Sequence, residues 1–321
     1  MKELARLTTQ GSDELSIDSL IDAARAYAAR DRAPRTLKEY RRDWRKFTRF
    51  CEARNFAALP ATEESVAIYI TALAQARLKY STITRALAAI SVAHKNAGHE
   101  TPTSREVVLR VLKGIRNTIG VARTKKAPVV VEDLRELVMK LPASVAGIRD
   151  RALLVLGFAG ALRRSELVAL DASDILFIRD GLELTIRHSK TDQEKAGKKL
   201  GLPYGSNPLT CPVRTLQSWL EKAPREGAIF RAVTQRGKIG ARLSDKDVAR
   251  IIKRACVAAE LNPKSFSGHS LRRGFVTTAA RAGKLERDIM RQTRHKSVVM
   301  VREYIEEAGL FENNPASGIG L

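Results

Sequence analysis

Long apolar runs are missing from the sequence, and so are the short motifs of several common protein classes. No segment approaches the about 20 consecutive apolar residues of a transmembrane helix, so we expect no membrane partner. The chain begins with MKELARLTTQGSDELS, which lacks the apolar centre of a secretory signal and predicts a cytoplasmic protein. No GxxxxGK[ST] loop occurs, so nothing indicates ATP-driven work.

Cysteine and aromatic residues are also scarce. The 3 cysteines, Cys51, Cys211 and Cys256, form no CxxC pair, so the sequence supports neither a disulfide framework nor a zinc site. Aromatic residues make up only 5% of the chain, which disfavours a single-strand binder with many base-stacking platforms. The acidic cluster of a two-metal nuclease is not apparent either. We therefore expect neither a metal ion nor a cofactor.

Basic residues, in contrast, are in large excess. The chain has 57 Lys and Arg against 35 Asp and Glu, a net charge of +22 that extends over both halves of the sequence. A hydrophobic content of 44% argues for a globular fold, and 321 residues suggest about two domains. Positive charge spread over two globular domains is typical of a protein that binds a polyanion, with nucleic acid as the first candidate.

Residues 15–119 predict a helical DNA-binding domain. Apolar residues recur every three or four positions in four segments, which indicates amphipathic helices over 35–51, 62–78, 82–96 and 104–118. In the last of these, Val107 and Val108 are expected to face the core. Basic residues lie opposite the apolar stripes of the first and third helices; those expected to contact DNA are Lys38, Arg42, Arg45, Lys46, Arg49 and Arg85. A solvated surface is the alternative for any single helix, but the recurrence favours a surface that faces DNA.

Residues 120–130, GVARTKKAPVV, predict a linker between domains, in which Lys125 and Lys126 are further candidate DNA contacts. Residues 131–321 predict a second domain that is mostly helical with a small antiparallel sheet. Two strand-like runs, 175–178 and 182–186, flank the turn signal Arg-Asp-Gly, and a third strand is expected at 199–203. Helices are expected at 131–141, 147–159, 212–222, 244–259, 269–282, 285–291 and 297–305.

The residues that suggest chemistry lie in four separate segments of the second domain. These segments are 157–175, 187–200, 267–283 and 294–305, and together they supply arginines, a turn lysine, two histidines and a tyrosine. Such a set suits transfer of a phosphodiester without a metal ion. The reaction needs a nucleophile, positive charge around the phosphate, and an acid for the leaving oxygen. Arginine suits the charge role because its planar fork donates to two phosphate oxygens at once.

The four segments resemble the sequence boxes of the tyrosine recombinase (phage integrase) family. GALRRSEL resembles the first arginine box, SKT the hairpin lysine motif, HSLRR the H-x-x-R box, and RHKSVVMVREYI the closing box. The resemblance covers nearly the whole chain, with 15–119 as the core-binding domain and 131–321 as the catalytic domain. It implies the catalytic residues Arg163, Lys190, His269, Arg272, His295 and the nucleophile Tyr304. Tyr204 is the only other tyrosine of the catalytic domain, and it lies in no motif.

Several residues next to these boxes have more than one interpretation. Arg164 and Arg273 adjoin catalytic arginines and are candidate DNA contacts. Glu166 either supports the geometry of the active-site arginines or forms a simple helix salt bridge. The family often has His where this chain has Arg273, and Gly where it has Arg294. Both differences are expected to add charge next to the phosphate.

The resemblance also implies how the protein acts. Only about 15 residues precede the expected helical domain, which favours the two-domain architecture of Cre and the Xer recombinases over integrases with an extra N-terminal domain. The expected partner is double-stranded DNA with short inverted half-sites, bound by a dimer on one site and a tetramer in the synapse. The apolar C-terminal tail, residues 309–321, is expected to dock on a neighbouring protomer; folding back on its own domain is the alternative. Two other functions stay open: a type IB topoisomerase, and a catalytically inactive DNA-binding regulator.

Overall fold

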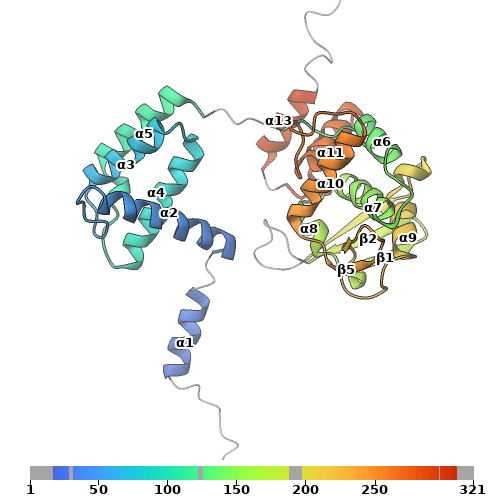
Figure 1. Cartoon of the computed structure of the whole chain (residues 1–321), viewed down its shortest axis with the longest axis horizontal. Coiled ribbons are helices and arrows are strands. Elements are labelled where there is room, and N and C mark those ends of the chain that lie inside the picture. Colours follow the sequence, from blue (N-terminus) through green and yellow to red (C-terminus); the bar gives the residue numbers. More distant parts are fainter. Residues whose placement is uncertain (1–16, 29–31, 122–125, 188–196, 296, 309–321) are drawn as a thin grey trace, which may run out of the picture. The chain divides into compact units, whose positions relative to one another are not determined.

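The computed structural model describes residues 17–28, 32–121, 126–187, 197–295 and 297–308. The chain divides into two compact units, Met1–Arg123 and Thr124–Leu321, each with its own hydrophobic core (Figure 1). The described residues are mostly helical with small antiparallel sheets, so the expected fold class is confirmed.

The first unit is entirely helical in its described residues. Its elements are α1 (Ile17–Ala28), α2 (Pro34–Glu52), α3 (Glu63–Gln75), α4 (Tyr80–Asn96), η1 (Pro102–Ser104) and α5 (Glu106–Ile119). Helix α2 packs on α4, and α3 packs on α5. The four helices α2 to α5 share one core, which contains the fully buried side chains Phe47, Ile70, Ile83, Ile90 and Val108.

Two side chains of this unit differ from the sequence expectation. Val107 was expected inside, but it is 42% exposed, because its neighbour Val108 takes the inward position on α5. Arg85 was expected to face solvent. Instead its Nε donates to Oδ2 of the buried Asp43 at 2.6 Å, which ties α4 to α2. Arg85 therefore neutralises a buried carboxylate and is still 35% exposed at its side chain.

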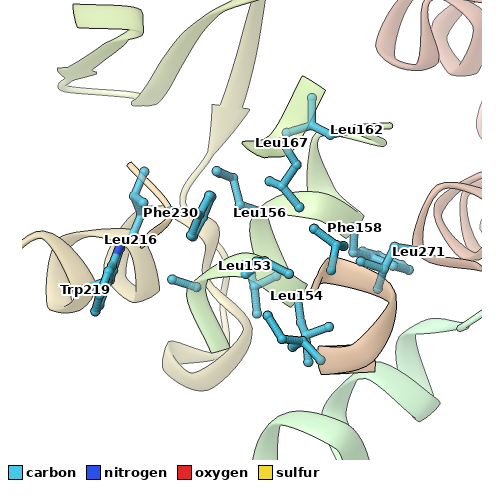
Figure 2. Packing of buried hydrophobic residues seen from close by; sticks show 14 of the residues in the cluster. Leu153, Leu154, Leu156, Phe158, Leu162, Leu167, Leu216, Trp219, Phe230 and Leu271 are labelled. Atoms are coloured by element: carbon cyan, nitrogen blue, oxygen red, sulfur yellow. The ribbon is translucent and has the colours of Figure 1, made fainter. Parts of the chain in front are cut away.

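The second unit surrounds one buried helix. Its helices are α6 (Val131–Met139), α7 (Val145–Ala159), α8 (Arg164–Ala169), α9 (Pro212–Leu220), α10 (Asp245–Ala258), α11 (Ser270–Arg281), α12 (Glu286–Thr293) and α13 (Val298–Ala308), with the short turns η2 (Ala172–Asp174) and η3 (Pro208–Thr210). Residues 152–158 of α7 are all buried, so this helix forms the centre of the unit. Figure 2 shows Leu153, Leu156 and Phe158 of α7 among side chains from the surrounding elements. This packing fixes the end of α7, where the candidate site begins.

A three-stranded antiparallel sheet packs against this core. The strands β1 (Ile175–Ile178), β2 (Gly181–Ile186) and β3 (Lys198–Pro203) follow in the order β1-β2-β3, and Leu184 pairs with Leu200. Gly181 has a φ of 152° and leaves no room for a Cβ, which would lie 2.2 Å from the Leu202 carbonyl oxygen. The Arg-Asp-Gly turn signal is thus confirmed. A second hairpin, β4 (Arg231–Val233) with β5 (Ile239–Arg242), was not predicted.

None of the helices in the described ranges combines the length and the hydropathy needed to cross a lipid bilayer. The three cysteines are free thiols, and all of them are buried in the two cores.

Candidate active site

The site is built around the turn between α7 and α8. Ala161 has a φ of 45°, which turns the chain sharply after Gly160 and directs its carbonyl oxygen towards α11 and α12. That oxygen accepts a hydrogen bond from Nη1 of Arg272 at 2.6 Å, and Nη2 of Arg294 lies 3.4 Å from it. Arg163 follows the turn as the N-cap residue of α8. Three arginines that are far apart in sequence thus meet at one turn.

Arg163 is held by a buried carboxylate. Glu166, one turn further along α8, accepts from Nη1 of Arg163 at 2.6 Å and from the Arg163 backbone N–H at 2.9 Å. Burial alone would raise the pKa of Glu166, but the charges of Arg294 and Arg163 and their hydrogen bonds lower it to about 2. Glu166 therefore stays ionised at every pH near neutrality. This supports the interpretation of Glu166 as a support for arginine geometry, which the sequence left open.

Arg272 comes from the first turn of α11 and is only 5% exposed. Besides the Ala161 contact, its Nη2 donates to the carbonyl oxygen of Thr293 at the end of α12. Burial lowers the pKa of Arg272, and the cations Arg163 and Arg294 lower it further, whereas Glu166 and Tyr304 raise it. The guanidinium group is fixed by backbone acceptors on two elements, so its position does not depend on a bound ligand.

His295 lies just after α12, and its tautomer follows from its neighbour. The Thr293 hydroxyl donates to the Ile289 carbonyl oxygen at 2.8 Å, so towards Nδ1 of His295, also at 2.8 Å, it acts as an acceptor. This arrangement favours the tautomer with the ring proton on Nδ1 and the lone pair on Nε2. Burial lowers the pKa of His295 to about 4, with Arg272, Arg163 and Arg294 acting in the same direction.

Tyr304 lies on α13, beside α11 (Figure 1). Val301 of the same helix is fully buried against Val276 and Ile289, which anchors α13 to α11 and α12. The Tyr304 ring centroid lies 6.4 Å from that of His295, and the Arg273 guanidinium carbon lies 5.2 Å from the Tyr304 ring centroid. The candidate nucleophile is thus next to His295 and Arg273.

His269 occupies a different environment. It is the N-cap residue of α11, one turn before Arg272, and its side chain is exposed. The preceding Gly268 is packed against Arg164, where an added Cβ would lie 1.7 Å from the Arg164 Cδ. A glycine at this position lets the Arg164 side chain cross over the start of α11 towards Asp245. Lys190, the sixth predicted catalytic residue, lies outside the described residues.

Comparisons with known proteins identify the family of the chain. A family model described as "Phage integrase family" matches residues 129–309, and one described as "Phage integrase, N-terminal SAM-like domain" matches residues 26–100. The chain belongs to the phage integrase family. It is 39% identical over 291 residues to a protein of Selenomonas ruminantium named "Integrase/recombinase xerD homolog", a match that covers 89% of this chain and 85% of that protein.

Solved structures show the same fold. A lambda integrase dimer bound to a COC′ core site matches with a TM-score of 0.62 and 20% identity, over 90% of this chain and 95% of that one. A lambda integrase tetramer bound to a Holliday junction also matches with a TM-score of 0.62, at 19% identity, over 93% of this chain and 80% of that one. The resemblance inferred from the sequence boxes is therefore confirmed.

In this integrase-family protein, the residues that meet at the site suit chemistry on a phosphodiester. The charges of Arg272 and Arg163 act on His295, and the His295 ring lies beside the hydroxyl-bearing ring of Tyr304. No group of three or more His, Cys, Asp or Glu side chains suited to a metal ion occurs among the described residues. The arrangement suits binding of a phosphodiester next to a tyrosine.

The sequence placed Arg294 beside the site but gave no indication that its side chain is buried. It was expected to add charge next to the phosphate, but its side chain is 4% exposed and points inward, where Nη2 donates to Oε2 of Glu166 at 2.9 Å. The backbone of Arg294 has a φ of 58°, a left-handed conformation that glycine adopts most easily. The family's frequent glycine at this position was the available signal, because it indicates a left-handed C-cap.

The candidate DNA contacts of α2 form one exposed surface. Lys38, Arg45, Lys46 and Arg49 are exposed, opposite the buried Phe47. Arg42 is exposed on the same side and pairs with Glu39 at 2.5 Å. The contacts between these residues and DNA stay predictions.

Two candidate DNA contacts of the second unit, Lys126 and Arg273, already form hydrogen bonds within the protein. Lys126 donates through Nζ to the Lys264 carbonyl oxygen at 2.7 Å, while Lys125 lies outside the described residues. Arg273 donates to the Lys126 carbonyl oxygen and lies over the Tyr304 ring. Arg273 therefore links the expected linker to the candidate nucleophile.

Proposed function

We propose that the chain is a site-specific DNA recombinase that cuts and rejoins double-stranded DNA through a 3′-phosphotyrosine intermediate. Membership of the phage integrase family and the relative named as a recombinase support this function. The observation that carries it is that Arg163 and Arg272 lie close enough to His295 for their charges to act on it, while the His295 ring lies beside Tyr304, although these residues come from separate elements of the second unit.

In the proposed reaction, the Tyr304 hydroxyl oxygen attacks the scissile phosphorus, and the bond from phosphorus to the 5′ oxygen breaks. His269 takes the phenolic proton, and Lys190 protonates the leaving 5′ oxygen. Attack by the 5′-hydroxyl of a partner strand reverses these steps and exchanges the strands. Because the phosphotyrosine conserves the bond, we expect the reaction to need neither ATP nor a metal ion.

Arg163, Arg272 and His295 are proposed to stabilise negative charge on the non-bridging phosphate oxygens. Electrostatic stabilisation is strong where donors are fixed before the substrate arrives. The hydrogen bonds of Arg163 to Glu166 and of Arg272 to two carbonyl oxygens supply such fixation. In the tautomer that the Thr293 contact favours, Nε2 carries no proton, so we propose that Nε2 becomes a donor when the phosphate's negative charge raises the pKa of the ring.

The DNA partner and the assembly are part of the same proposal. Residues 15–119 and 131–321 would clamp one half-site, with the segment 120–130 between them. The two lambda integrase structures are a dimer on a core site and a tetramer on a Holliday junction, which supports a dimer on one site and a tetramer in the synapse here. The tail that we expect to pass to a neighbour, residues 309–321, lies outside the described residues. A DNA substrate also supports a cytoplasmic location.

Recovering and sequencing the DNA that becomes covalently attached to the protein tests this function. A recombinase should be trapped on a recurring short sequence with inverted half-sites. Attachment to unrelated sequences would instead indicate a type IB topoisomerase, which relaxes DNA with little need for a defined site. Absence of attached DNA would indicate a DNA-binding regulator without catalytic activity.

The proposed role of Lys190 as the general acid leads to a separate prediction. Lys190→Ala should cleave an ordinary phosphodiester poorly, because the 5′ oxygen then leaves without a proton. A substrate with sulfur at the bridging 5′ position has a better leaving group, so cleavage by the variant should recover. Arg163→Ala serves as the control, since its loss of charge stabilisation should not be rescued by sulfur. Equal rescue of both variants would remove Lys190 from this role.

A further inference from the structure

Arg294 occupies a position that is costly for an arginine. Its left-handed backbone, with a φ of 58° and a ψ of 37°, costs a residue other than glycine about 1–2 kcal/mol. The side chain is 4% exposed, and its buried Nε has no hydrogen-bond partner in the described part of the chain. A glycine would avoid these costs, so an arginine is retained here only through the contacts of its guanidinium group.

The contacts of Arg294 connect the parts of the site. Nη2 donates to Oε2 of Glu166 at 2.9 Å, and Nη1 donates to the carbonyl oxygens of Gln292 at 2.9 Å and Gly160 at 3.2 Å. Nη2 also lies 3.4 Å from the Ala161 carbonyl oxygen, which holds Arg272. One guanidinium group thus joins the end of α12, the turn before α8, and the carboxylate that supports Arg163.

The charge balance around Glu166 shows what Arg294 contributes to the site. Glu166 is a single buried carboxylate, and both Arg163 and Arg294 donate to it. If Arg294 were absent, the charge of Glu166 would be balanced by Arg163 alone. A phosphate would then meet a weaker field at Arg163. With Arg294 present, the carboxylate has its own buried counter-charge, and the charges of Arg163 and Arg272 remain to act on the substrate.

We propose that Arg294 is a positioning residue, which holds the Glu166 carboxylate and the Gly160–Ala161 turn in place and thereby fixes Arg163 and Arg272 for the phosphate. The inference rests on the proposed function, because its effect is measured on DNA cleavage. Arg294 makes no contact with DNA in this account. It acts on the reacting atoms only through Glu166 and the turn.

The test compares cleavage with binding in a small set of variants. Arg294→Gly removes the side chain and suits the left-handed backbone, Arg294→Lys keeps the charge, and Glu166→Gln removes the partner charge. Arg291→Met is the matched control, because Arg291 lies on the same helix but its side chain is 83% exposed. For each variant we would measure single-turnover formation of the covalent complex at saturating DNA, using the duplex recovered by trapping. DNA affinity at several salt concentrations and the thermal unfolding temperature would be measured alongside.

Arg294→Gly should slow covalent-complex formation by about 10²-fold, the scale of effect expected when a reacting group is displaced by about 1 Å. DNA affinity and its salt dependence should be unchanged. Arg294→Lys should recover part of the rate, and Arg291→Met should react like the original protein. The double variant Arg294→Gly/Glu166→Gln should be no slower than the slower single variant, because both changes remove one shared interaction.

Three results would overturn the inference. One is a normal cleavage rate in folded Arg294→Gly. Another is full additivity of the two substitutions. The third is a salt slope lowered by about 1, which would mean that Arg294 contacts a phosphate directly. Failure of the original protein to form any covalent complex is a different outcome, since it contradicts the proposed function itself. If Arg294→Gly does not fold, the rate of Arg294→Lys and its additivity with Glu166→Gln decide the question.

Discussion

At the scale of single residues, the geometry of the site depends on the acceptors that fix its arginine side chains. Arg163 and Arg272 are both fixed by acceptors of the protein itself, one by a carboxylate and the other by carbonyl oxygens. The sequence boxes indicated both residues as catalytic, and the structure places both at the Ala161–Arg163 turn, while their catalytic role stays a prediction. They could not predict the carbonyl acceptors, because those depend on the left-handed turn at Ala161, for which alanine gives no sequence signal.

His295 gives a pH-dependent prediction at this scale. Its pKa is lowered from 6.5 to about 4 by burial and by the neighbouring arginines. The unfolded chain therefore takes up this proton before the folded protein does. The contribution of His295 to the free energy of unfolding is complete above pH 6.5 and is lost as the pH falls towards 4.

NMR titration of the histidine rings checks this prediction directly. The His295 resonances, assigned by comparison with His295→Gln, should titrate near pH 4 in the DNA-free protein. His269, which is exposed, serves as the internal comparison. A His295 titration at or above pH 6.5 would mean that the ring is not held as a neutral group among the arginines.

At the scale of elements, most helices and all three strands of the larger sheet could be predicted from periodicity and turn signals. The exceptions have physical reasons. Helix α8 is only 6 residues long, too short to show a period, and β4 and β5 have 3 and 4 residues. Val107 was predicted inside because valine at the edge of an apolar stripe cannot be told from a core residue by spacing alone.

The contact between α11 and the segment 127–129 gives a prediction for element packing. At Gly274 an added Cβ would lie 1.6 Å from the Val129 carbonyl oxygen, so the segment would have to move away from α11. Gly274→Ala should destabilise the protein by about 1–3 kcal/mol, as overpacking does. It should also disturb the contact of Arg273 with the Lys126 carbonyl oxygen.

Gly114→Ala is the matched control, because Gly114 lies within α5 and has open space around the position of a Cβ. That substitution should stabilise the protein by about 0.5–1 kcal/mol. Chemical denaturation of both variants measures the two effects. The packing argument fails if Gly274→Ala is as stable as the unaltered protein.

At the scale of the whole molecule, the net charge of +22 is spread over both units. Many phosphate contacts should make DNA binding steeply dependent on salt, with a slope of about −0.9 for each phosphate neutralised. A plot of log affinity against log salt concentration should therefore fall by several units per decade. Lys46→Ala, on the exposed surface of α2, should reduce the slope by about 1.

Arg105→Ala provides the comparison for this measurement. Arg105 is exposed but paired with Glu100 at 2.5 Å, and it is not among the predicted DNA contacts. Its loss should leave the slope nearly unchanged. A nearly flat plot for the original protein would mean that the basic surfaces serve something other than DNA.

The central claim is that Tyr304 becomes covalently joined to DNA, and peptide mapping of the trapped complex by mass spectrometry tests it most directly. The account predicts one nucleotide-bearing peptide, with the phosphate on Tyr304. It also predicts no such peptide from Tyr304→Phe, which lacks only the hydroxyl oxygen and should still bind DNA. A phosphate found on Tyr204, or an adduct that persists in Tyr304→Phe, would contradict the claim.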